Sequence, residues 1–567
     1  MGGRWCSTTR RTSWAPPPLT PDSGARAVTR SAGVRALDLM LAAGVALFAS
    51  SLVLFRAPWT ASALTGLRPE DVLVGLVVLV AARSALSAPR PPAVRPERAV
   101  AAGVVAYALV FSFVTVGRHY AFRTHALDLG QYAQSMWQLA RGQEPYDTIL
   151  GWHAWGNHFS PIFYPLAPLT LVFSGPAFLL VLQSVALALG AVPLFLLARA
   201  RVGAGAAAAI ALLYLLNPSL QGINVRDFHP AALAVPLLLT AMWAAERGYW
   251  LFFALATILT LATREDAAIA VVGLGLWLAL AQRRWIAGGA LAGISVVWLF
   301  VAIQSVMPAF REDATYPYLT AHYSHFGRSL GEILRAPFTH PLRVAGWLLT
   351  PDRALYLAAL LAPLGFLPLA APVASVGALS ALAQNLLSDY PVLYNFRAQY
   401  QSFVLPFLMV GAIVGLQKLV DHRLRAPRWS TPTRVLALAA VVSLVLSAPT
   451  ANDLAFHQWW PDARHRAAYR LLAMIPNGAT VSASERFFPH LYERTTVYVF
   501  PGFARKSDVV LVDGARLAQG RIDRVSASRD GDVIALENQA GGALRLTVIA
   551  EAEGWLLLRP EPATAIR

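Results

Sequence analysis

The sequence predicts an all-α polytopic membrane protein that carries an α/β domain at its C-terminal end. Of its 567 residues, 56% are hydrophobic and 14% are charged, whereas a soluble protein carries about 25% charged residues. The mean hydropathy is +0.50. Apolar runs of about 15 to 22 residues recur along the chain, as a bilayer core about 30 Å thick requires.

These runs predict about thirteen transmembrane helices. They are expected near residues 34–55, 71–88, 99–117, 176–198, 204–217, 230–245, 249–263, 266–282, 286–307, 353–370, 372–388, 401–417 and 434–450. The predicted regions are therefore a basic tail (1–33), two N-terminal helices (34–98), a membrane domain (99–450) with long loops at 118–175 and 308–352, and a soluble α/β domain (451–567).

The arginines predict the orientation in the membrane. The formal charge is +16, but the cations lie between apolar runs rather than in one basic domain, so nucleic-acid binding is not expected. Basic residues gather in the tail and in alternate links, which places the N-terminus in the cytoplasm and the C-terminal domain on the extracytoplasmic side of a cell membrane. Cys6 is the only cysteine, which excludes an internal disulfide and a cysteine-based metal site.

One stretch of the membrane domain allows two interpretations. The runs 249–263 and 266–282 are short and are separated by charged residues, so they form either two spans or one broken, re-entrant element. We favour two spans, because a single span would invert the later topology and place the basic segment 418–434 outside.

The C-terminal region has the pattern of a soluble α/β domain. Residues 462–474 predict an amphipathic helix, and residues 489–494 a helical turn. Short strands are expected at 479–483, 496–500 and 509–512, followed by an antiparallel meander at 533–537, 544–549 and 555–558. No glycine-rich phosphate loop precedes a helix, so nothing indicates nucleotide binding.

The first long loop holds the main candidate residue, Asp128. The residues after it predict a helix with Gln131 and Ser135 on a polar face and Tyr132 and Met136 on an apolar face that lies on the membrane. Asp128 would then hold a carboxylate at the water interface. The alternative is that Asp128 caps this helix, since Asp is a favoured N-cap residue.

Two further polar clusters are expected at the same face of the membrane, at 224–230 and 264–266. Ionisable groups near the membrane usually mark function or pair with one another. Arg226 and Arg264 have the bidentate geometry that binds phosphate. The alternative is that Arg226 pairs with Asp227, and Arg264 with Glu265 or Asp266.

Four histidines in these segments raise the question of a metal site. They are His125, His153, His158 and His229. No short ligand spacing of the His-x-x-x-His kind occurs, so we expect hydrogen-bonding or substrate-contacting roles instead of a zinc site.

The motifs at these positions resemble those of the bacterial and archaeal membrane-protein family catalogued as domain of unknown function 2079. The matching segments are 125–137, 156–161, 227–230, 264–267, 390–406, 475–481 and 488–491. The resemblance covers roughly residues 100 to 515 and leaves the first 95 residues, with two predicted spans, unmatched. That family in turn resembles the GT-C glycosyltransferases, which take sugars from polyprenyl-phosphate carriers.

The resemblance implies that Asp128 is the general base of an inverting sugar transfer to an extracytoplasmic glycan, lipid or protein acceptor, with membrane lipids as further partners. The candidate substrate-binding residues are the polar members of the motifs: His125, Gln131, Gln134, Trp137, His158, Arg226, Asp227, His229, Arg264, Glu265 and Asp266. No second acidic residue stands beside Asp128, so no cofactor is expected and a divalent metal is unsupported. The alternatives are a lipid or solute transporter or flippase, and a non-catalytic envelope scaffold.

Overall fold

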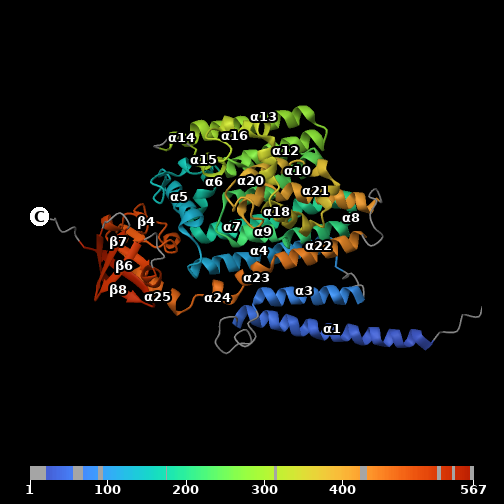
Figure 1. Ribbon diagram of the computed structural model, residues 1–567, viewed down its shortest axis with the longest axis horizontal. Helices are drawn as coiled ribbons and strands as arrows, with labels where there is room; N and C mark the ends of the chain where they lie inside the picture. Colours follow the sequence, from blue (N-terminus) through green and yellow to red (C-terminus); the bar gives the residue numbers. More distant parts are fainter. Residues whose placement is uncertain are drawn as a thin grey trace, which may run out of the picture.

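The computed structural model describes residues 21–54, 68–86, 94–173, 175–311, 316–421, 431–519, 525–538 and 543–561. Most of these residues form a helical bundle, and a β-sheet domain lies at one end of it (Figure 1). The mostly helical fold with a C-terminal sheet therefore agrees with the expected class. Most of the predicted basic tail and the basic residues 423–428 lie outside the described residues.

Two N-terminal helices lie along one flank of the bundle. α1 (Pro21–Leu54) packs on α3 (Pro69–Leu86), where the Arg83 Nε donates to Asp38 Oδ1 at 2.9 Å. Beyond α3 come α22 (Pro432–Leu446) and α23 (Ala448–Asp453), so α1 is the outermost of these helices (Figure 1). The pair is thus attached to the bundle through α3.

The main bundle is formed by helices of uneven length. It begins with α4 (Pro96–Tyr120), α7 (Gly175–Leu189), α8 (Ala191–Leu215), α9 (Pro218–Val225), α10 (Ala234–Arg247), α11 (Trp250–Thr263), α12 (Ala267–Leu280) and α13 (Trp285–Val301). It continues with α18 (Pro351–Leu361), α19 (Pro372–Ser375), α20 (Ala378–Leu387) and α21 (Leu405–Val420), and ends with α22 and α23. At Gly203, with φ 79° and ψ 166°, α8 is kinked between two helical segments.

Small residues allow close packing between helices. A Cβ atom on Gly288 of α13 would lie 2.5 Å from the carbonyl oxygen of Gly275 on α12, and one on Gly275 would lie 2.7 Å from that of Gly288. Such approaches exclude any larger side chain. They are typical of helices in membranes, where close van der Waals contact replaces the hydrophobic drive for association.

Polar contacts near the start of α11 and the end of α12 show that these two helices form a hairpin. Gln282, just after α12, donates to Glu246 at the end of α10 at 3.4 Å, and Arg201 of α8 forms a two-pronged ion pair with the same Glu246 at 2.6 and 2.7 Å. The start of α11 and the end of α12 therefore lie at one end of the bundle, and the charged turn Arg264–Asp266 lies at the other. The segment therefore forms two helices joined by this charged turn, and the expectation that each of them crosses the membrane stays a prediction.

Each predicted span falls on helix, but the number thirteen is not confirmed. Among the described residues, four helical stretches are long and apolar enough to cross a membrane by length and composition: Val34–Leu52, Pro96–Tyr120, Gly175–Val225 and Trp285–Ala309. The stretch Gly175–Val225 has 51 residues, which exceeds the roughly 20 residues of one crossing and includes the kink at Gly203. Other apolar helices, such as Leu405–Val420, are shorter than 18 residues.

Both long loops contain short structured elements. The first holds the π-turn Ala126–Gly130, α5 (Gln131–Ala140), a hairpin of β1 (Tyr146–Asp147) and β2 (Trp152–His153), and α6 (Phe163–Leu166). The second contains α14 (Met307–Ala309), α15 (Pro317–Tyr323), α16 (Leu330–Thr339) and α17 (Pro341–Leu348).

The prediction that the apolar face of α5 lies on the membrane is wrong. Tyr132 and Met136 pack into a buried apolar cluster, and Gln131 and Ser135 on the other face are also buried. The helix is enclosed between the bundle and the C-terminal domain, because Gly130 at its start contacts Phe488 of that domain. Sequence periodicity identified the helix but not the domain that covers its polar face.

The C-terminal domain is a seven-stranded mixed sheet in the order β4-β3-β5-β9-β8-β7-β6. Its elements are α24 (Phe456–Trp459), α25 (Ala463–Ala473), β3 (Val481–Ala483), β4 (Val497–Val499), β5 (Val509–Asp513), α26 (Gly514–Ala518), β6 (Val525–Asp530), β7 (Val533–Asn538), β8 (Ala543–Ala552) and β9 (Trp555–Pro560). β3 pairs in parallel with β4 and β5, β7 to β9 form the predicted antiparallel meander, and β6 adds a further antiparallel strand to it. The sequence did not predict β6.

The C-terminal domain is fixed to the bundle by Phe122, which follows α4. This side chain is 1% exposed and packs among the aromatic rings of Tyr469, Phe487, His490 and Trp555. The segment that leads from α4 to Asp128 is therefore held between the bundle and the sheet domain, which positions the candidate site.

Candidate active site

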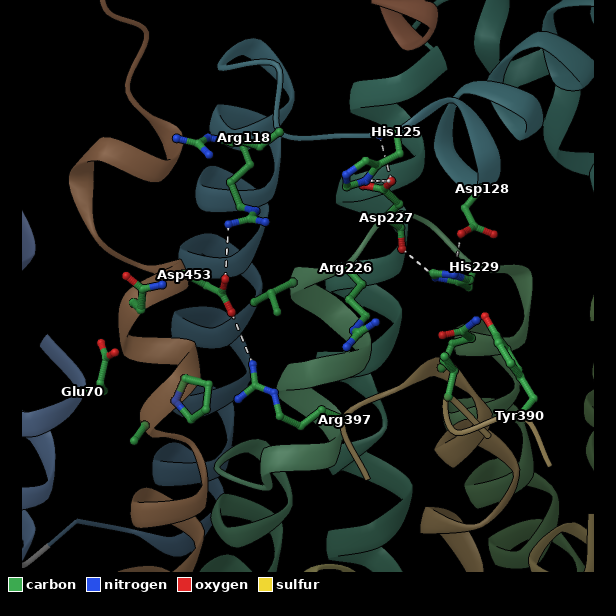
Figure 2. Close-up of a pocket in the computed structure, with 17 residues that line it drawn as sticks. Glu70, Arg118, His125, Asp128, Arg226, Asp227, His229, Tyr390, Arg397 and Asp453 are labelled. Carbon is green, nitrogen blue, oxygen red and sulfur yellow. Dashed lines mark hydrogen bonds and ion pairs between the residues drawn. The ribbon is translucent and has the colours of Figure 1, made fainter. Parts of the chain in front are cut away.

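A polar cleft of about 680 Å³ lies at the end of the bundle next to the C-terminal domain. It is lined by side chains from the N-terminal helix α3, the end of α4, the segments around 125–128, 225–229 and 390–399, and the segment 448–453. Figure 2 shows Asp128 and His229 at one end of the cleft, Glu70 at the other and Arg226 between them. Residues far apart in sequence thus form one continuous surface.

Asp128 has a strained backbone conformation. Its φ of 69° and ψ of −93° lie outside the helical region, in the middle of the π-turn Ala126–Gly130. A positive φ is uncommon for any residue with a Cβ atom and is less so for Asp and Asn than for most others. The fully buried neighbours Ala126 and Leu129 hold this turn in place. Strain of this kind concentrates at functional sites, where surrounding structure maintains it.

The alternative role of Asp128 as a helix cap is wrong. The N-cap position of α5 is Gly130, and no side chain donates or accepts a capping hydrogen bond there. The Asp128 carboxylate instead lies 3.3 Å from Nε2 of His229, with 42% of its side chain exposed in the cleft. Its orientation is therefore set by a tertiary contact.

His229 is fixed on both sides. Its backbone N–H donates to Gln183 Oε1 at 2.9 Å, and its ring Nδ1 donates to the carbonyl oxygen of Asp227 at 2.7 Å. The other ring nitrogen faces Asp128. Burial tends to raise the pKa of Asp128, but the positive potential of His229, with smaller contributions from His158 and Arg264, holds that pKa below its usual value.

Asp227 anchors the start of the Asp128 turn. Its Oδ2 accepts hydrogen bonds from both the backbone N–H and the ring Nδ1 of His125, at 2.9 and 3.0 Å. The bond to Asp227 raises the pKa of His125 above its usual value. The suggested pairing of Arg226 with Asp227 is therefore wrong, because this carboxylate is occupied by His125.

Arg226 is exposed and projects into the middle of the cleft (Figure 2). Within the described part of the chain it makes no hydrogen bond or ion pair. Beside it, Asp453 links Arg118 and Arg397 through contacts of 3.3 Å each, and Nη1 of Arg397 is buried with no hydrogen-bond partner among the described residues. Two guanidinium groups thus retain donors for an anion.

Arg264 has a different environment from Arg226. It is 3% exposed, and its Nε and Nη2 bind the two carboxylate oxygens of Asp266, with an Nε–Oδ1 distance of 2.6 Å. The pairing alternative is confirmed for this residue. Of the two arginines considered for phosphate binding, only Arg226 lines the cleft.

A second polar cluster adjoins Asp128. His158 Nδ1 and the backbone N–H of Phe159 donate to the two oxygens of Glu265, at 2.9 and 3.0 Å. The hydroxyl of Tyr318 reaches both Asn157 and His158. This cluster contributes to the electrostatic environment of Asp128 but does not line the cleft.

Three further candidate substrate-binding residues, all on α5, also lie away from the cleft. Gln131 and Gln134 are buried in α5, where Gln134 donates to the carbonyl oxygen of Arg494 at 2.8 Å and so ties the helix to the C-terminal domain. Trp137 stacks beneath the Arg141 guanidinium at 4.7 Å. All three side chains make packing contacts, because α5 is enclosed between the bundle and the C-terminal domain.

The structure brings together five of the twelve candidate residues at the cleft: His125, Asp128, Arg226, Asp227 and His229. Sequence analysis did not select Glu70, Arg118, Tyr390, Arg397 or Asp453, which also line it. Their shared feature is position, since each lies near a helix end on the cleft side of the bundle. Among the described residues, no three His, Cys, Asp or Glu side chains form a group that could hold a metal ion.

A comparison with known protein families identifies the family of this chain over most of its length. The model of the family described as "Predicted membrane protein (DUF2079)" matches residues 118–557. The chain belongs to this family. The helices α1 and α3 and nearly all of α4 precede the matched region. A comparison with curated protein sequences gives no match.

Solved structures show looser likenesses. ArnT from Cupriavidus metallidurans in the apo state is 15% identical, with 80% of this chain and 96% of that chain covered and a TM-score of 0.47. The same protein bound to undecaprenyl phosphate is 13% identical, with coverages of 81% and 98% and a TM-score of 0.47. The archaeal oligosaccharyltransferase AglB from Archaeoglobus fulgidus, in complex with an inhibitory peptide and a dolichol-phosphate, is 12% identical, with coverages of 81% and 76% and a TM-score of 0.38. We transfer no residue role from these structures.

Proposed function

We propose that this protein is a membrane glycosyltransferase that moves a sugar from a polyprenyl-phosphate donor to an extracytoplasmic acceptor. The observation that carries the proposal is the arrangement of the cleft. An exposed carboxylate, Asp128, stands at one end, and the arginines with unpaired donors, Arg226 and Arg397, lie farther along the same cavity. Transfer of a sugar from a phosphate carrier needs a carboxylate to accept a proton and cations to bind the phosphate.

The arginines supply the anion-binding part of the site. A guanidinium can bind two phosphate oxygens in parallel and stays charged at all physiological pH values. As the bond between the sugar C1 and the phosphate oxygen breaks, negative charge grows on that oxygen. Fixed cations at this position stabilise the transition state more than the ground state. Arg226 is the residue best placed for this role, because it has no competing protein partner in the described chain.

Asp128 supplies the proton acceptor. It takes the proton from an acceptor hydroxyl while the oxygen of that hydroxyl forms a bond to C1 and the lipid phosphate leaves with the electron pair of the broken bond. Direct displacement inverts the configuration at C1. The contact with His229 keeps Asp128 ionised and aimed into the cleft, which prepares it to accept the proton.

The surroundings suit a lipid-linked substrate. The cleft lies at the end of a bundle with apolar helices, so the polyprenyl chain can remain in the bilayer while its phosphate reaches the arginines. The C-terminal domain covers the segment that precedes Asp128 and leaves the cleft accessible to an acceptor from the aqueous side.

Binding of a lipid phosphate tests the proposal. The full-length protein in detergent is expected to bind undecaprenyl phosphate, and Arg226→Lys is expected to weaken binding by about tenfold because bidentate contact is lost. Arg247→Lys is the control, since Arg247 is exposed at the opposite end of the bundle. Equal affinity of wild type and Arg226→Lys would contradict the assignment. Lipid movement across liposome membranes without sugar transfer would favour the flippase alternative.

A further inference from the structure

The helix α3 forms part of the cleft although it lies outside the family match. Glu70 stands in the first turn of α3 and lines the cavity at the end opposite Asp128 (Figure 2). The family match begins at residue 118, after α3. Glu70 thus reaches the cleft from an element that precedes the region matched by the family model.

One oxygen of the Glu70 carboxylate pairs weakly with Arg68, and the other has no hydrogen-bond partner among the described residues. The oxygen without a partner is Oε2, which is buried, and Oε1 lies 3.7 Å from Arg68 Nη1. Leaving a buried charged oxygen unpaired costs free energy. Glu70 also adds to the effect of burial in raising the pKa of Asp453, so its charge is felt by the group that links Arg118 and Arg397.

The charges lining the cleft are closely balanced. Four arginines and four carboxylates line it, together with the two histidines His125 and His229. His125 contacts Asp227, which raises the pKa of its ring, so His125 is the histidine that adds positive charge to this balance. Without Glu70 the arginines would outnumber the carboxylates. The present balance suits a ligand with a small negative charge.

We propose that α3 completes the cleft and that Glu70 makes it selective for a lipid carrier with one phosphate over a carrier with two. The inference rests on the proposed function and specifies which carrier class the site accepts. A second phosphate brings additional negative charge into a cavity where Arg118 and Arg397 are already shared with Asp453, and the Glu70 carboxylate repels it. A unit charge about 10 Å away at an effective dielectric constant near 20 changes affinity by about tenfold.

The experiment compares two probes with the same lipid chain, undecaprenyl phosphate and undecaprenyl diphosphate. Their dissociation constants are measured for the full-length wild type, Glu70→Gln and Glu97→Gln. Glu70→Gln keeps the shape of the side chain and removes its charge. The control, Glu97→Gln, removes the same charge from an exposed pair with Arg199 at the opposite end of the bundle.

We expect the wild type and Glu97→Gln to bind the monophosphate at least about tenfold more tightly than the diphosphate, and Glu70→Gln to reduce this preference by about tenfold. Glu70→Asp, which retains the charge, is expected to keep the preference, so a purely structural effect is separated from an electrostatic one. An unchanged preference in Glu70→Gln would overturn the inference and leave the proposed function intact. Failure of the wild type to bind either probe would overturn both.

Discussion

His229 joins Asp128 to the backbone of Asp227 through its two ring nitrogens, at 3.3 Å from the Asp128 carboxylate and 2.7 Å from the Asp227 carbonyl oxygen. The contact therefore places an imidazole nitrogen against the candidate base and leaves the other carboxylate oxygen available to the cleft. It also makes His229 a positioning residue rather than a proton acceptor.

The first prediction concerns the pH dependence that this pair creates. His229→Gln retains a hydrogen-bond donor for Asp128 but removes the imidazole that lowers the pKa of Asp128, so that pKa is expected to rise towards the usual carboxylate range. Since the base must be ionised, the acidic limb of the pH profile of kcat/KM should shift to higher pH. His340→Gln, at an exposed position, is the control. An acidic limb at the same pH in both variants would show that His229 does not tune Asp128.

The second prediction concerns stability. Burial raises the pKa of Asp147 from 3.8 to about 6, although its Oδ1 accepts hydrogen bonds from the backbone of Ile149 and Leu150. The folded protein then holds this proton to higher pH than the unfolded chain. The contribution of Asp147 to stability therefore falls as pH rises from about 4 to about 6 and stays reduced above that.

Asp147→Asn is expected to raise the melting temperature at pH 7.5 and not at pH 4, because Asn keeps the acceptor oxygen without the buried charge. The change in pKa corresponds to about 3 kcal/mol at most. Thermal unfolding of the purified protein at the two pH values measures the effect, with the exposed Glu144→Gln as the control. Stabilisation of equal size at both pH values would contradict this explanation.

The third prediction concerns the attachment of the C-terminal domain. Phe122→Ala removes the ring that packs among Tyr469, Phe487, His490 and Trp555, and truncation of a buried Phe typically costs about 3 to 5 kcal/mol. We expect faster amide hydrogen exchange in α25 and β3 and a loss of sugar transfer, because the segment leading to Asp128 loses its support. Phe503→Ala, at a 53% exposed position, should change neither. Unchanged exchange in Phe122→Ala would show that this ring does not hold the domain.

The fourth prediction concerns orientation in the membrane. In a Cys6→Ser background, a cysteine at the exposed Asn477 of the C-terminal domain should react with an impermeant thiol reagent in intact cells. A cysteine at Arg247, at the opposite end of the bundle, should react only after the cells are opened. The expectation follows from the excess of arginine in the links at that end. The reverse pattern would place the cleft in the cytoplasm and exclude an extracytoplasmic acceptor.

The sequence predicted the structure best where a local pattern of apolar residues determines the secondary structure. Apolar runs placed helices at every predicted span, and alternating residues identified strands such as β5 and β9, because burial imposes these periods directly. The strand β6 was missed because its residues Ser528, Arg529 and Asp530 are polar and exposed, so burial imposes no apolar alternation on them. The covering of α5 was also missed, because a polar face looks the same whether water or another domain lies against it.

The candidate site was predictable only in part. Asp128, Arg226 and His229 were identified because polar groups next to apolar runs are costly and therefore conspicuous. Arg397, Asp453 and Glu70 come from segments distant in sequence, and only the packing of α3 and α23 brings them to the same cleft. No local pattern distinguishes Arg226, which is open to the cleft, from Arg264, whose partner is two residues away.

The most direct test of the account is turnover of a polyprenyl-phosphate sugar by purified, monodisperse Asp128→Asn. Asn has nearly the same shape as Asp and also tolerates a positive φ, so the turn around Asp128 should be preserved. Undecaprenyl phosphate binding, measured in parallel, should remain within about threefold of wild type because the arginines are intact. The account predicts a loss in kcat of about 10²- to 10⁴-fold, the usual contribution of a general base. Near-normal turnover by Asp128→Asn would contradict the central claim that Asp128 accepts the proton.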